Sequence, residues 1–563
     1  MSARFRTWPG RRALALLLAV GLVAAACGGG GGGDDDDDAT GPDTEEEGAP
    51  EAGGRVIYGL EAETDGGFCL PEAQLAISGI MVARTIYDTL TAPNADGDYV
   101  PYLAESVEPN ADYTQWTITI RDGVKFHDGS DLTAEVVKNN IDAYRGEYKD
   151  ASGTLIRRPL LFIFVFQDIA SVEVADPRTV VVTTDRPWVA FPSYLHSSGR
   201  MGILGQAQLD DAENCDENLV GTGPFQLDEW VRNDHLTAVR NEDYWRQDGD
   251  GNQLPYLDEI EFRPIIEATQ RQNAIQAGQI SMTHESGGER IAQYRPLAES
   301  GTINLVESEE QAEVLYMLLN SSVPPFDNIL ARRAVAHAIN YEQLNSLRNQ
   351  DIFTVANGPF APGEVGYLED TGFPTYDQEL ARDLVEQYEA ETGQPLTFTG
   401  SSTSDPGTIQ SVQVVQQMLA DVGIETSLRS TDQATLINEA IGGQYQAHVW
   451  RNHPGGEPDG QYIWWHTGLP TNFGRINDPE IDRLLDEGRV TADEATRQQI
   501  YEDLNRRFAE QVWNIWLWWP TWAIPSSTDV HGVYGPTLPD GSDPPETLGT
   551  GHPTVGLWVS GGG

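Results

Sequence analysis

Lysine is nearly absent from this chain of 563 residues, which contains only Lys125, Lys138 and Lys149. Lysine and arginine together number 35 against 87 aspartate and glutamate residues, so the formal net charge at pH 7 is −52. A side-chain surface for nucleic acid or for an anionic membrane needs clustered basic residues. The acidic excess argues against both partners, and it favours either adaptation to a salty exterior or general solubility.

Cysteine is equally scarce. Only Cys27, Cys69 and Cys215 are present. Neither they nor the ten histidines show the spacing of metal ligands, so we expect no metal site and no cofactor. Cys27 ends an apparent export segment, which leaves Cys69 and Cys215 as an expected disulfide in an oxidising compartment. Two unconnected thiols are the alternative.

Hydrolase motifs are missing as well. The chain has no G-x-S-x-G elbow and no H-E-x-x-H helix. With 87 acidic residues, many carboxylate pairs could be proposed for glycoside hydrolysis, so the presence of such a pair is uninformative. We therefore predict that the protein is not an enzyme, with a secreted hydrolase as the less favoured alternative. The absence of internal repeats argues against an adhesive surface protein.

The N-terminus has the pattern of an export signal. Arginines precede an apolar segment, 13–26, that is too short to span a membrane, and we predict a signal peptide over 1–26. Val-Ala-Ala-Ala-Cys27 resembles a lipobox, with Ala24 where leucine is usual, so Cys27 is expected to carry lipid. Ordinary secretion remains the alternative, and Arg11–Arg12 leaves the twin-arginine route open. The Gly-rich and acidic stretch 27–54 predicts a flexible tether.

Residues 101–140 carry the most informative pattern. Trp116, Ile118 and Ile120 alternate with polar residues, as in a half-buried strand. A turn at Gly123 and a helix start at Thr133 follow. The string A-E-S…W-x-I-x-I-R-D-G-V-K-F-H-D-G-S…T-A-E-V-V resembles the signature of the peptide/nickel class of solute-binding proteins that feed ABC importers.

Two further landmarks of the same class follow in order. They are V-G-T-G-P-F at 220–225, and Y-M-L-L-N…P-P-F-D…R-R-A-V-A-H-A-I-N at 316–340. Periodicity elsewhere predicts further elements. The predicted helices cover 80–90, 132–144, 329–339, 379–389, 408–422, 478–490 and 494–511. The predicted strands cover 55–61, 315–320, 423–428, 446–450 and 512–522.

The resemblance covers about residues 55–530 and implies an α/β fold. Its members have two lobes of the type II periplasmic-binding-protein kind (cluster C), with an extra α+β subdomain inserted in lobe one. By this pattern lobe one covers 55–310, with the subdomain at about 80–215. Lobe two covers 311–522, and 523–563 returns to lobe one. The length of 563 residues agrees with two lobes, because single hydrophobic cores stop growing near ~250–300 residues.

Function is likewise implied by the resemblance. Such a protein is a monomeric receptor anchored by lipid on the outer face of the cytoplasmic membrane. It closes on a peptide-like or other small organic solute and delivers it to an ABC permease. An oligosaccharide is the alternative solute.

The expected ligand contacts depart from the peptide-binding pattern. In those members an aspartate three residues after the equivalent of Trp450 pairs with the ligand's ammonium group. Here His453 stands at that position, and Glu457 or Asp459 could substitute. Aromatic walls and a few polar groups complete the prediction, although buried core tryptophans would look the same in sequence. The candidate ligand residues are Glu61, Trp450, Asn452, His453, Glu457, Asp459, Trp464, Trp465, Asn472 and Trp518.

Overall fold

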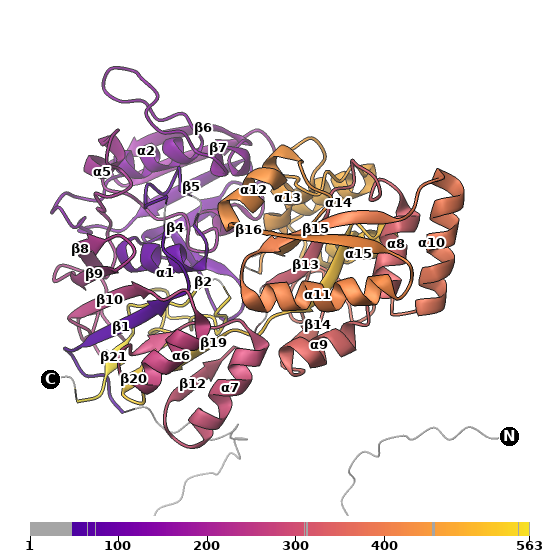
Figure 1. Ribbon diagram of the computed structural model, residues 1–563. Helices are drawn as coiled ribbons and strands as arrows, with labels where there is room; N and C mark the ends of the chain where they lie inside the picture. Colours follow the sequence, from indigo (N-terminus) through magenta and orange to yellow (C-terminus); the bar gives the residue numbers. More distant parts are fainter. Residues whose placement is uncertain are drawn as a thin grey trace, which may run out of the picture. The chain divides into compact units, whose positions relative to one another are not determined.

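The computed structural model describes residues 48–561, except 65, 74, 309, 311–312, 453–455 and 550. The predicted signal peptide, Cys27, nearly all of the tether and His453 therefore lie outside the described residues. Residues 49–563 belong to one compact unit. Within it, two large mixed sheets are each covered by helices (Figure 1).

The first large sheet has seven strands in the order β12-β19-β11-β1-β10-β9-β8. We call the part built on it the first lobe. Central β1 pairs in parallel with β10 and β11, and Val56, Tyr58 and Leu60 of β1 are buried. Its strands are β1 (Arg55–Leu60), β8 (Phe225–Val231), β9 (His235–Arg240), β10 (Glu259–Pro264), β11 (Met282–Thr283), β12 (Asn304–Glu307) and β19 (Ala523–Ser526). The helices of this lobe are α1 (Ile77–Ile86), α6 (Ala268–Gln276) and α7 (Gly288–Glu299).

A four-stranded antiparallel sheet, in the order β4-β5-β7-β6, lies between β1 and β8 in the chain. Trp116, Ile118 and Ile120 of β5 are at most 3% exposed, which confirms the strand predicted from alternation. Gly123 has a φ of +76°, and the Thr133 hydroxyl caps α2 by accepting from the N–H of Val136. The elements of this region are β2 (Thr91–Pro93), β3 (Tyr99–Pro101), β4 (Ala104–Pro109), β5 (Gln115–Ile120), α2 (Ala134–Tyr144), α3 (Phe162–Val165), β6 (Ile169–Asp176), β7 (Thr179–Thr184), α4 (Phe191–Tyr194) and α5 (Gln206–Asp210).

The second large sheet has six strands in the order β14-β18-β13-β17-β15-β16, and we call the part built on it the second lobe. Helices lie along this sheet (Figure 1). Its strands are β13 (Val314–Leu319), β14 (Thr354–Val355), β15 (Thr397–Thr403), β16 (Glu425–Thr431), β17 (Ala447–Asn452) and β18 (Asn514–Trp519). Its helices are α8 (Ile329–Ala338), α9 (Tyr341–Asn349), α10 (Gln378–Thr392), α11 (Pro406–Ala420), α12 (Gln433–Gly442), η1 (Pro458–Gln461), α13 (Tyr462–Trp465), α14 (Pro479–Val490) and α15 (Glu494–Gln511).

The chain passes from the first large sheet to the second between β12 and β13. It returns between β18 and β19, and the short strands β20 (Val530–His531) and β21 (Trp558–Val559) pair near its end. Several predicted bounds were wrong by a few residues. The helix predicted over 80–90 ends at Ile86 because Tyr87 is extended, and the strand predicted from 512 begins at Asn514 because Val512 caps α15 with a φ of +52°.

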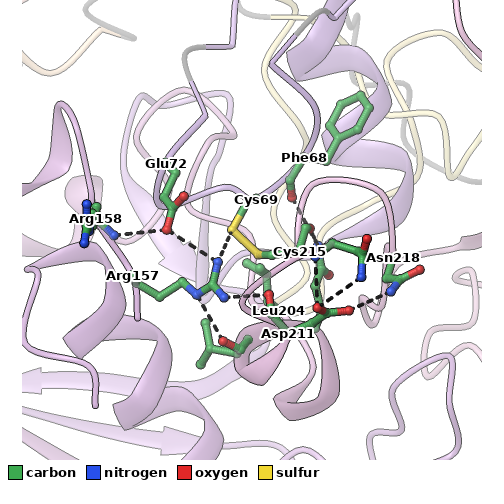
Figure 2. Close-up of a disulfide and its surroundings, with 12 residues drawn as sticks. Phe68, Cys69, Glu72, Arg157, Arg158, Leu204, Asp211, Cys215 and Asn218 are labelled. Atoms are coloured by element: carbon green, nitrogen blue, oxygen red, sulfur yellow. Dashed lines mark hydrogen bonds and ion pairs between the residues drawn. A yellow bond between two sulfur atoms is a disulfide. The ribbon is translucent and has the colours of Figure 1, made fainter. Parts of the chain in front are cut away.

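Cys69 and Cys215 are joined in a disulfide (Figure 2). Arg157 lies beside it, with Nη1 3.0 Å from the Cys69 sulfur and Nε donating to the Leu209 carbonyl at 3.1 Å. The Phe68 N–H donates to the carbonyl of residue 216 at 2.9 Å. The bond therefore ties the segment after β1 to the loop before β8. For a sequence separation of 146, the chain-entropy model gives ~4–5 kcal/mol of stabilisation.

Candidate functional site

A carboxylate and an imidazole meet where two neighbouring strands of the first lobe end. Glu61 directly follows β1, and His284 follows β11, which pairs in parallel with β1. The carboxyl ends of parallel strands share one edge of a sheet, where ligands collect in α/β proteins. The His284 Nε2 lies 3.8 Å from the Glu61 Oε2, and their side chains are 3% and 37% exposed. Within the described residues, neither ring nitrogen of His284 has a hydrogen-bond partner.

The second lobe and the crossing segments supply an arginine to the same place. Arg451, near the end of β17, pairs with Glu313 on the first crossing segment, with 3.3 Å between Nε and Oε1. The indole N–H of Trp522, on the returning segment, donates to the other oxygen of Glu313 at 2.7 Å. Arg451 also donates to the Ser286 hydroxyl of the first lobe at 3.1 Å. Buried Glu313 thus orients an arginine whose side chain remains 32% exposed.

These groups set the charge of the site. Burial alone would raise the pKa of Glu61, but the adjacent imidazole of His284 and the charges of Arg451 and Arg271 lower it to about 2. Arg271 is itself paired with Glu285 at 3.4 Å, and burial raises the pKa of Glu285. The site therefore presents an ionised carboxylate from one lobe and a guanidinium from the other.

Two of the predicted aromatic residues remain candidates for a wall. Trp450 in β17 and Trp464 in α13 are partly exposed, and the ring centroid of each lies 5.5 Å from that of Phe473. Asn452 pairs through its backbone with Val314 at the end of β17, and its side chain lies outside the described part. Their contact with a solute stays a prediction.

The two carboxylates put forward as substitutes for the missing aspartate have other partners in the structure. Asp459 is fully buried, and it accepts hydrogen bonds from Arg489 Nε and from Trp188 Nε1, both at 3.0 Å. Glu457 caps η1 and forms an ion pair with Arg497. Both side chains thus stabilise the protein's own fold, which corrects the expectation that they face a ligand.

Three further candidates belong to the interior. Trp465 is 3% exposed and packs against Phe508 with tilted rings, their centroids 4.4 Å apart. The Asn472 side chain donates to the Ile476 carbonyl at 2.8 Å and accepts from its N–H at 3.0 Å, so it holds a loop. Trp518 is 4% exposed and lines a cavity within the second lobe. Sequence could not separate these side chains from wall residues, because bulk and polarity are the same in both settings.

Comparison with known proteins identifies the family. The group described as bacterial extracellular solute-binding proteins, family 5 (middle part), matches residues 98–474, which is more than half of the chain. The chain belongs to this family. A relative, the glutathione-binding protein GsiB of Salmonella typhi, is 29% identical over 453 residues, covering 78% of this chain and 83% of the relative.

Solved structures confirm the two-lobed fold. The periplasmic binding protein AgaA of A. tumefacien R10, in complex with agropinic acid, superposes with a TM-score of 0.76 at 24% identity, covering 90% of this chain and 99% of that one. DppA of Helicobacter pylori, in complex with the peptide STSA, has a TM-score of 0.76 at 20% identity, with 90% and 98% covered.

Two absences concern the described residues alone. Among them, no helix is both long enough and apolar enough to cross a membrane. The same residues contain no cluster of histidine, cysteine, aspartate and glutamate side chains that could hold a metal ion.

A second contact between the lobes, which sequence reasoning missed, is centred on Arg489 at the end of α14. Its side chain is 1% exposed, and its Nη1 lies 2.9 Å from Asp168 Oδ2 while its Nη2 donates to the Tyr194 hydroxyl at 3.0 Å. Burial alone would lower the pKa of Arg489, but the charges of Asp459 and Tyr194 raise it above its ordinary value. No local pattern could reveal this contact, because the partners lie about 300 residues apart in the chain.

Proposed function

We propose that this protein is the receptor of an ABC importer for small zwitterionic, peptide-like solutes. The observation that carries the proposal is the opposite charge of Glu61 and Arg451, whose side chains are 37% and 32% exposed. A carboxylate accepts the ammonium group of a zwitterion, and a guanidinium forms charge-assisted hydrogen bonds with its carboxylate. Because the two residues belong to different lobes, one solute contacting both favours the closed state.

His284 completes this arrangement. A buried imidazole with two unused nitrogens loses hydrogen bonds that it would make in water. A polar group of the solute beside Glu61 restores one of them. The proposal agrees with the printed ligands of similar proteins, namely glutathione for GsiB and a peptide for DppA. It includes no catalytic step, since the solute is handed on unchanged.

The lipobox-like sequence supports anchoring of the mature chain through Cys27 on the outer face of the cytoplasmic membrane, where the permease would receive the solute. Labelled fatty acid should enter the wild-type protein and be absent from Cys27→Ser. Equal labelling of the two proteins would contradict the anchor.

The solute class is tested by calorimetric titration of the full chain with alanyl-alanine. We expect Glu61→Gln to weaken binding at least tenfold, because an ion-paired ammonium loses its partner. Glu267→Gln, an exposed carboxylate just before α6, is the matched control and should change the Kd less than twofold. Equal affinity of the two variants would refute the role of Glu61.

Native mass spectrometry of the protein purified without refolding tests the oligosaccharide alternative. A co-purified mass matching a short peptide or an amino-acid conjugate supports the zwitterion. A sugar mass would overturn it and transfer the binding role to the partly exposed Trp450 and Trp464.

A further inference from the structure

An apolar cavity of about 80 Å³ lies in the second lobe between α11 and the six-stranded sheet. Protein interiors are close-packed, and voids larger than a water molecule are few. Polar residues such as Ser401, Thr426 and His448 contribute to its lining, but most of the lining side chains are aliphatic or aromatic. Among them are Val412, Val415 and Leu419 of α11, and Met317, Phe398 and Val449 of the sheet.

Gly400, in the middle of β15, contributes to this space. A Cβ built there would meet only the Leu428 Cδ2, at 3.8 Å, which is ordinary contact distance. Glycine weakens a strand because it has no side chain to pack. A larger residue would therefore fit at position 400, and glycine keeps the cavity open.

Trp518 provides a polar group at the cavity. Its side chain is 4% exposed and lines the cavity. Within the described residues, its indole N–H has no hydrogen-bond partner. A buried donor without an acceptor costs free energy. An occupant with one acceptor atom would relieve that cost.

Strand register connects the cavity to the charged site. Leu315 of β13 pairs with Arg451 of β17 on one side and with Trp518 of β18 on the other. Directly opposed residues place their side chains on the same face of a sheet. Both Leu315 and Trp518 line the cavity, so Arg451 lies next to its edge, about 10 Å across two strand spacings from Trp518.

We propose that the cavity beneath α11 receives the apolar side chain of the solute whose carboxylate pairs with Arg451. This inference rests on the proposed function and narrows it. The solute is an amino-acid derivative or short peptide with an aliphatic or aromatic side chain near its carboxylate. Because position 400 is glycine, the cavity has room for a larger side chain of the solute. The Trp518 N–H can donate a hydrogen bond to one acceptor atom on that side chain or next to it in the solute.

The test compares the Kd of the full chain for alanyl-leucine and alanyl-alanine, by calorimetry. The larger side chain should bind at least tenfold more tightly to the wild type, since each buried methylene adds a several-fold gain. Gly400→Val fills the cavity and should reduce this preference to less than twofold. Thr399→Val, whose side chain points to the opposite face of β15, is the matched control and should keep the preference.

A Gly400→Val protein that melts at the wild-type temperature and keeps the full leucine preference would overturn the inference. So would a wild type that binds both dipeptides equally. If neither dipeptide binds the wild type, the zwitterion proposal itself fails. The binding of benzene then tests separately whether the cavity takes an apolar group. A melting temperature raised by benzene in the wild type and not in Gly400→Val supports an apolar pocket, and equal shifts overturn it.

Discussion

The substitution Trp188→Phe removes one hydrogen bond between the lobes and keeps an aromatic ring. The indole N–H of Trp188, just after β7, donates to Asp459 Oδ2 in the second lobe at 3.0 Å, and both side chains are fully buried. A hydrogen bond to a charged group contributes about 1.5–3 kcal/mol. Asp459 keeps its Arg489 partner at 3.0 Å in the variant, so the loss is confined to the closed state. The closed-to-open ratio should fall roughly 10- to 150-fold.

The assay is the Kd for alanyl-alanine together with small-angle scattering at increasing dipeptide concentration. Affinity should fall by the same factor as the closed-to-open ratio, and compaction should require correspondingly more dipeptide. Trp116→Phe is the matched control, since Trp116 is 3% exposed and its N–H has no partner among the described residues. If both variants lose stability and neither changes Kd or compaction, the Trp188 bond supports the fold and not closure.

Two further predictions concern Glu61 and the disulfide. The pKa of Glu61 is lowered from 4.5 to about 2, so its stabilising contribution is complete above pH 4.5 and is lost as the pH falls toward 2. Melting temperatures of wild type and Glu61→Gln should therefore converge across that window, and a constant difference would contradict it. Replacing both Cys69 and Cys215 by serine should lower the unfolding free energy by ~2–5 kcal/mol in denaturant titrations, and an unchanged midpoint would show that the bond adds no stability.

Local patterns predicted elements whose side chains alternate regularly or whose ends carry capping residues. Strand β5 is such a case, because burial of Trp116 and Ile118 leaves no other register. The location of Glu61 at the edge of the sheet could also be predicted from the sequence, because it depends only on where a strand ends. Asp459 was misjudged because its partners come from a different sheet, and no spacing within the chain encodes them. Tryptophan is ambiguous for the same reason, as Trp465 and Trp464 differ only in which side of one helical turn meets the core.

The two interlobe contacts differ in how far their charges are already paired and buried without a solute. Arg489 and Asp459 both belong to the second lobe, and they form an ion pair with each other. The free-energy cost of burying these two charges is therefore offset by a pair that exists before the lobes meet. Closure then adds Trp188, Asp168 and Tyr194 of the first lobe to that pair. At the other contact the side chains of Glu61 and Arg451 stay partly exposed, which leaves room for the ligand contacts proposed above. Under the proposed function, a zwitterion that contacts both Glu61 and Arg451 would supply the differential affinity that shifts the equilibrium toward the closed state.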